Sequence, residues 1–169
     1  MVSGIDVKAG AQIRRATRAD IPVVLELIRA LAEYEKLAHL VQADEATIAN
    51  ELFGDNGPAE TLLCTPEGKA VGFAVYFHNF STFMGRKGLY LEDLFVRPEH
   101  RGRGYGKALF LHVAGIAHQR GCGRFEWMVL DWNAPSIRFY ESLGAQRMEQ
   151  WRLFRLTGDA LAALARQTG

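Results

Sequence analysis

Near the middle of the chain an apolar segment runs into a glycine-rich turn, and few folds accommodate that junction. Leu89–Val96 is apolar except for Glu92 and Asp93, which is typical of a strand buried near the centre of a sheet. Beyond the turn, apolar side chains recur at helical spacing from near Gly104 and stop before Gly121. The order of strand, turn and helix predicts an α/β structure built around this central strand.

Further strands and helices are predicted on both sides of this junction. The expected strands cover residues 12–16, 71–77, 124–130, 145–150 and 151–156. The expected helices cover residues 17–34, 44–53, 134–143 and a last segment from Gly158. The turn Pro66–Gly68 separates two extended runs and predicts a hairpin. This mixed order favours a mostly antiparallel sheet with flanking helices.

The composition suits one compact domain with its own core. The 169 residues are 49% hydrophobic and 23% charged, so we expect a flexible N-terminal tail over residues 1–10 and a single domain over residues 11–169. The net charge of +1 gives no indication of a nucleic-acid partner or an anionic membrane. Neither the cysteines nor the histidines have metal-site spacing, so we expect no metal. Without a signal or membrane segment, a cytoplasmic location is expected.

The glycine-rich turn has the features of a phosphate-binding loop. A turn that ends in a helix N-terminus directs free backbone N–H groups to one point, and glycines let a phosphate approach the backbone. Arg101, Arg103 and Lys107 add positive charge. A nucleoside-triphosphate loop does not fit, because Ala108 follows the lysine, and a dinucleotide-binding turn needs a different glycine spacing. A solvated, glycine-rich helix start is the remaining alternative.

The pattern R-x-x-G-x-G after an apolar strand is the acetyl-CoA signature of the GNAT acetyltransferases, and Arg101–Gly106 resembles it at each position. Other blocks are similar to the diamine and polyamine N-acetyltransferase branch of this family. They are Leu31–Glu35, Tyr90–Val96, Asp131–Asn133, Ser136–Tyr140 and Leu143–Ala145. The resemblance spans nearly the whole chain. It implies the GNAT fold, an α/β fold with a mixed, mostly antiparallel sheet, a splayed central strand and flanking helices.

The resemblance also implies acetyl-CoA as co-substrate. The backbone of the central strand would pair with the pantetheine arm like an added strand, and the turn would hold the pyrophosphate. The implied cofactor-binding residues are Leu94, Phe95, Val96, Arg101, Gly102, Arg103, Gly104, Tyr105, Gly106, Lys107, Asn133, Ala134, Pro135, Ser136 and Tyr140. For Asn133, an ordinary helix cap is an open alternative.

Acetyl transfer to an amine requires a proton acceptor for the amine and a proton donor for the departing thiolate. Glu92 is the expected base, because alternation along a strand puts it on the face of Leu94 and puts Asp93 on the opposite face. An ion-paired acid or a substrate anchor is the alternative role for Glu92. Tyr140 resembles the family's thiolate-protonating tyrosine, although such a tyrosine is often structural. Without an evident serine or cysteine nucleophile, we expect direct attack in a ternary complex.

The resemblance implies a pocket for a small-molecule amine. Its expected lining is Tyr34, Glu35, Glu92, Glu126, Trp127 and Trp151, and acids and aromatic faces suit a cation. Ser81 and Phe83 stand where polyamine-acetylating relatives carry an aspartate, so a diamine or a lysine-like amino acid fits as well as a polyamine. A homodimer is implied by analogy. A protein or peptide amine as substrate, or a non-catalytic acyl-CoA sensor, is the alternative, and RNA binding would need more interleaved aromatic residues.

Overall fold

The computed structural model describes residues 11–168, which divide into two compact units on either side of the bond between Met128 and Val129. The expected tail over residues 1–10 lies outside the described residues, and the single domain over residues 11–169 stays a prediction. Within residues 11–168, no helix has the length and apolar character needed to cross a bilayer.

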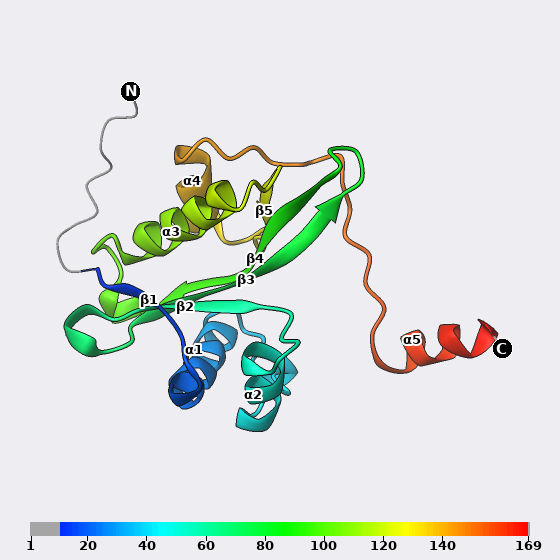
Figure 1. The fold of residues 1–169 in the computed structure, drawn as a ribbon, viewed down its shortest axis with the longest axis horizontal. Coiled ribbons are helices and arrows are strands. Elements are labelled where there is room, and N and C mark those ends of the chain that lie inside the picture. The colour runs from blue at the N-terminus through cyan, green and yellow to red at the C-terminus, as the bar shows by residue number, and fades with distance from the viewer. Residues whose placement is uncertain (1–10, 169) are drawn as a thin grey trace. The chain divides into compact units, whose positions relative to one another are not determined.

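The first unit is built on a five-stranded sheet (Figure 1). Its strands lie in the order β1 (Ile13–Arg15), β2 (Glu60–Cys64), β3 (Gly72–Ser81), β4 (Arg86–Val96) and β5 (Phe125–Trp127). Neighbouring strands are antiparallel except β4 and β5, which are parallel. The predicted mixed, mostly antiparallel sheet is therefore confirmed, although β5 is shorter than expected.

Helices cover both faces of this sheet. The helices α1 (Ile21–Tyr34) and α2 (Glu45–Phe53) lie on one face, and α3 (Tyr105–Gln119) lies on the other (Figure 1). Short 3-10 turns stand at Arg18–Asp20, Ala38–Leu40, Pro66–Gly68 and Pro98–His100. Burial of the apolar helix faces stabilises this layered arrangement, at about 1.5–3 kcal/mol for each large side chain.

The start of α1 is set by polar residues that the sequence displays. The Thr17 N–H donates to the Asp20 carboxylate at 2.8 Å, and Arg14 donates to both oxygens of that carboxylate at 2.8 and 2.7 Å. The hydrogen bonds from Arg14, and to a smaller extent those from Thr17, hold the pKa of Asp20 well below its usual range. The helix is thereby fixed at its N-terminus, with Pro22 in the first turn.

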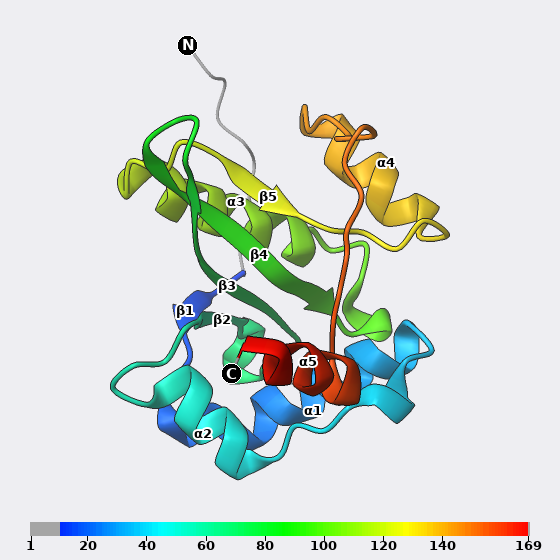
Figure 2. The same ribbon diagram turned by 90° about the vertical axis from the view of Figure 1, so that its right-hand side faces the viewer.

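The central strand β4 is paired on both sides over only part of its length. On one side it pairs with β3 from Arg86 to Val96, but on the other it pairs with β5 only from Leu89 to Leu91. No described strand pairs with β4 on that side beyond Leu91, so β4 continues past the end of β5 (Figure 2). The splayed central strand is thus present and has an open edge.

A β-bulge interrupts β4 where the open edge begins. Tyr76 of β3 pairs with Leu91, and the adjacent Val75 pairs with Asp93, so Glu92 is an extra residue without a partner across the ladder. Asp93 and Leu94 pair with the adjacent residues Val75 and Ala74, so they lie on opposite faces as alternation predicts, whereas the shared face of Glu92 and Leu94 stays a prediction. The bulge breaks the two-residue period on which that expectation depended.

The second unit contains two helices joined by a long segment without regular structure (Figure 1). These are α4 (Ala134–Ser142) and α5 (Gly158–Ala165), and a 3-10 turn, Arg166–Thr168, follows. The strands expected at residues 145–150 and 151–156 are not formed among these described residues, and that prediction is wrong for this structure. A strand requires a paired neighbour, and here a turn bond from Trp151 N–H to Met148 C=O bends the segment instead.

Candidate active site

The open edge of β4 presents unpaired peptide groups. Arg97 N–H donates to Val71 C=O at 2.9 Å, which shows that the peptide groups of Arg97 point toward β3. Successive residues of a strand direct these groups to opposite edges, so Phe95 also faces β3, whereas Leu94 and Val96 face the open edge. An added strand would therefore bond to Leu94 and Val96. Phe95 contributes its side chain to the core instead and is only 3% exposed.

The glycine turn leads directly from this edge into α3. Gly102 and Gly104 have φ angles of +73° and +85°, a left-handed conformation that glycine adopts without strain. The first intrahelical bond of α3 runs from Ala108 N–H to Gly104 C=O, at 2.9 Å. The N–H groups of the three residues before Ala108 therefore have no acceptor within the helix. This arrangement fits a pyrophosphate at the helix N-terminus.

Three cations belong to this turn, and their surroundings differ. Arg101 donates from Nε to the Val96 carbonyl at 2.9 Å, and its guanidinium lies 4.3 Å from the centroid of the Tyr34 ring. By contrast, Arg103 and Lys107 are exposed and make no hydrogen bond or ion pair with any residue of 11–168. These two side chains are free to attract phosphate groups, while Arg101 is already engaged.

Three carboxyl groups gather where α1 ends beside the bulge of β4. Glu92 is exposed, and Asp93 and Glu35 are partly buried. Burial, followed by the charges of Glu92 and Glu35, raises the pKa of Asp93 to about 7. Burial also raises the pKa of Glu35. Mutual repulsion of this kind favours uptake of a proton or a cation by the group.

Asp93 has no hydrogen-bond or ion-pair partner for its carboxylate within residues 11–168, although it lies on a buried face. Because it pairs with Val75, it lies on the face of the sheet that packs against α1. Two adjacent acids in an otherwise apolar strand indicate a functional site at Glu92 and Asp93. The directions of the two side chains, however, depend on the bulge.

Two residues expected to line the amine pocket have other contacts. The Glu126 carboxylate accepts from the Asn79 side chain at 3.2 Å and is ion-paired with Arg124 at 2.9 Å. The Trp127 ring packs against those of Phe110 and Phe125, with centroid distances of 4.9 and 5.0 Å. These contacts stabilise the sheet and α3, and a role for Glu126 or Trp127 in the amine pocket stays a prediction.

The other expected residues belong to the second unit. The Asn133 side chain caps α4, accepting from Ser136 N–H at 3.4 Å, so the alternative of a helix cap is realised. Tyr140 is partly buried, and burial raises its pKa to about 12. The phenol therefore keeps its proton at neutral pH. Trp151 is 70% exposed.

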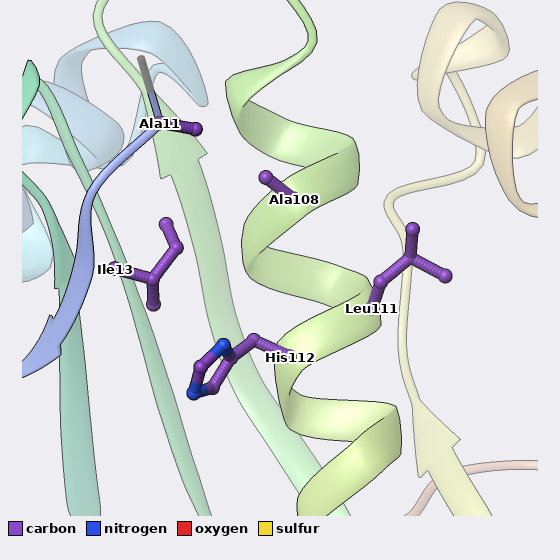
Figure 3. Close-up of a pocket in the computed structure, with 5 residues that line it drawn as sticks. All are labelled: Ala11, Ile13, Ala108, Leu111 and His112. Carbon is purple, nitrogen blue, oxygen red and sulfur yellow. The ribbon is translucent and has the colours of Figure 1, made fainter. Parts of the chain in front are cut away.

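A separate pocket lies between β1 and α3. It has a volume of about 390 Å³ and is lined by Ala11, Ile13, Ala108, Leu111 and His112 (Figure 3). The side chains of His112 and Ile13 point toward one another across it (Figure 3). No residue predicted to bind acetyl-CoA or the amine lines this pocket. The candidate site therefore consists of the open strand edge and the turn, not of this cavity.

Comparison with known proteins agrees with this geometry. Residues 24–145 match the acetyltransferase (GNAT) family. The chain is 38% identical over 168 residues to thialysine N-epsilon-acetyltransferase of Sus scrofa, covering 93% of this chain and 98% of that protein. It is 34% identical over 199 residues to L-ornithine N5-acetyltransferase NATA1 of Arabidopsis thaliana, covering 91% and 87%.

A solved structure is similar over nearly the same length. An integron cassette protein from the mobile metagenome of V. cholerae is 27% identical, with a TM-score of 0.79 and coverage of 94% of this chain and 99% of that one. The splayed strand, the turn and the relatives together lead to one conclusion. The chain belongs to the GNAT acetyltransferase family and is an acetyl-CoA-dependent N-acetyltransferase.

Proposed function

We propose that this enzyme acetylates a primary amine of a small cationic molecule, namely a diamine, a polyamine or a lysine-like amino acid. The observation that carries the proposal is the group of carboxyls formed by Glu35, Glu92 and Asp93 beside the open edge of β4. An amine with a second positive charge would relieve their mutual repulsion. The named substrates of the two relatives, thialysine and ornithine, both have this character, which supports the same class.

The binding part of the proposal assigns acetyl-CoA to the residues expected from the sequence. Leu94 and Val96 offer peptide groups for the pantetheine arm, and the helix N-terminus with Arg103 and Lys107 offers donors and charge for the phosphates. The Leu94 N–H is also the expected donor to the acyl oxygen as negative charge develops on it.

The chemical part assigns proton transfers to three side chains. A primary amine has a pKa of about 10 and is largely protonated at neutral pH, so a carboxylate must accept its proton before attack. Glu92 is the proposed acceptor, and Asp93, with a pKa near 7, is a second candidate on the same strand. The amine nitrogen then attacks the thioester carbon directly. As the C–S bond breaks, the thiolate takes its proton from the Tyr140 hydroxyl, and the second proton that the nitrogen loses on becoming an amide returns to Tyr140.

The test is release of free thiol from acetyl-CoA across a panel of thialysine, ornithine, lysine, a short diamine, a polyamine and amine-bearing peptides. We expect turnover of one or more small amines, with peptides inactive. The variants Glu92→Gln and Asp93→Asn separate the two candidate bases, because the base variant lowers kcat by about 100-fold. If the other carboxylate only attracts the cationic amine, its variant raises KM for the amine and leaves kcat nearly unchanged.

Turnover confined to peptides would replace the proposal with a protein or peptide acetyltransferase. Binding of acetyl-CoA without turnover of any amine would replace it with a non-catalytic acyl-CoA sensor. A homodimeric state and a cytoplasmic location complete the proposal.

A further inference from the structure

The guanidinium of Arg101 has a position that a simple phosphate ligand does not require. Its Nε donates to the Val96 carbonyl at 2.9 Å, and its Cζ lies over two aromatic rings, 4.3 Å from the Tyr34 centroid and 5.5 Å from the Phe95 centroid. We propose that Arg101 is a positioning residue that joins the open edge of β4, the glycine turn and the end of α1 into one rigid unit.

The bond to Val96 acts on the cofactor edge itself. Val96 is the last residue of β4, and its carbonyl faces the open side, where an added strand would lie. The bond from Arg101 fixes the orientation of this carbonyl, and with it the direction of the Val96 and Leu94 peptide groups that face the open edge. Arg101 therefore determines where the open edge ends and how the turn leaves it.

The aromatic contacts extend the link to the amine side of the site. Tyr34 is the last residue of α1, and its ring lies 6.5 Å from that of Phe95. Glu35, one of the three clustered acids, follows it directly. A cation over aromatic faces is attracted by the ring electrons, so loss of the guanidinium would loosen α1 as well as the turn.

Comparison with nearby cations shows that positive charge alone does not explain the contacts of Arg101. Arg103 and Lys107 supply positive charge to the same turn without any such contacts among residues 11–168. Arg97 also reaches α1, through an ion pair with Glu26 at 3.2 Å, but that contact lies at the exposed surface and involves no strand edge. Arg97 is therefore a matched control for loss of an arginine that links the same two segments.

The first test compares two acetyl donors that share the pantetheine arm, of which only one carries the phosphates. Binding of acetyl-CoA and of S-acetylpantetheine, which lacks the pyrophosphate, is titrated calorimetrically without any amine. We expect Arg101→Gln to weaken both about tenfold, because the strand edge is affected. Arg101→Lys, which keeps the charge but lacks Nε and the planar face, should behave like Arg101→Gln, while Arg97→Gln binds both like the wild type.

Weakened binding of acetyl-CoA alone, or full affinity in Arg101→Lys, would overturn the inference and make Arg101 a phosphate contact. Unchanged affinity in both variants would also overturn it. The inference rests on acetyl-CoA binding and not on the identity of the amine. A failure of the proposed substrate class would appear in the turnover panel while leaving this titration interpretable.

The second test measures the coupling between Arg101 and Tyr34. If the two act as one unit, Tyr34→Leu weakens acetyl-CoA binding by a factor similar to that of Arg101→Gln, and the double variant is no weaker than either. Effects that multiply in the double variant would show that the residues act independently and would contradict the inference. Thermal unfolding of each variant, with a Tm close to that of the wild type, checks that the loss is not due to misfolding.

Discussion

Asp93 shows how burial and neighbouring charge set the protonation of a single side chain at this site. Its carboxyl group is flanked by Glu92 on the same strand and by Glu35 at the end of α1, and its pKa of about 7 lies far above its value of 3.8 in an unfolded chain. The folded state therefore holds a proton on Asp93 that the unfolded chain releases. Above about pH 7 Asp93 is ionised in the folded state as well, and there it lowers the free energy of unfolding most.

We predict that Asp93→Asn stabilises the protein at high pH and not at low pH. Because the folded pKa is raised, the free energy of unfolding of the wild type falls as the pH rises from about 4 through 7. Asparagine removes this loss, so the variant should be about 1–3 kcal/mol more stable at pH 8 and nearly equal at pH 4. Urea unfolding at both pH values measures the difference. An equal gain in the free energy of unfolding at both pH values would show that the effect does not come from protonation of Asp93.

Tyr140 gives a second prediction for a single side chain. Tyr140→Phe removes the hydroxyl proton while keeping the ring, so kcat should fall by about 10- to 100-fold, and the Kd for acetyl-CoA should stay nearly unchanged. Steady-state turnover and calorimetric titration measure the two quantities. Unaltered turnover would exclude Tyr140 as the proton donor.

Among the elements, the turn before α3 combines backbone conformation with access to phosphate. Gly104 has φ +85°, and a Cβ built on it would meet no atom within 4 Å. Gly121, beyond the other end of α3, has φ +66° and is equally open. The two glycines thus have the same conformational requirement, but only one of them belongs to the candidate site.

We predict that Gly104→Ala and Gly121→Ala lose a similar amount of stability but differ in function. Each substitution forces an alanine into a left-handed conformation, at a cost of about 1 kcal/mol in the free energy of unfolding. Only Gly104→Ala should weaken acetyl-CoA binding, because its methyl group occupies the approach to the helix N-terminus. Chemical denaturation and calorimetric titration of both variants check this, and equal affinities would exclude a phosphate site at this turn.

The elements also show what can be predicted from sequence. The start of α1, the central strand and the turn before α3 follow from caps, apolar runs and glycines that act over a few residues. The bulge at Glu92 could not be predicted in this way, because it is set by the register against β3, where Tyr76 pairs with Leu91 and Val75 with Asp93, residues 15 and 18 positions away. The strands expected after Gly144 failed for a related reason, since apolar residues make a strand only where a neighbour pairs with them.

On the scale of the whole molecule, the second unit exposes many large apolar side chains. They are Trp132, Met148, Trp151, Leu153, Phe154, Leu156, Leu161 and Leu164, with Phe154 91% exposed. Exposed apolar groups on this scale are typical of surfaces that are covered in the functional state. The proposed homodimer would cover them with a second copy of the chain.

We predict that the protein is a dimer at micromolar concentration and that Phe154→Asp shifts it toward monomers. Size-exclusion chromatography with light scattering measures the mass of each. Gln167→Asp, also on the exposed C-terminal segment but without an apolar side chain, adds the same single negative charge and should leave the dimer intact. A monomeric wild type would contradict the prediction.

The unpaired residue in β4 has a consequence for how this strand can change. Removing Glu92 would leave each remaining pair of the β3–β4 ladder in place, so a chain one residue shorter would satisfy the sheet at least as well. Pairing with β3 therefore does not require that residue, whereas the proposed acetyl transfer does. We expect a deletion of Glu92 to shorten β4 without loss of its ladder and to leave an intact protein without its proposed base.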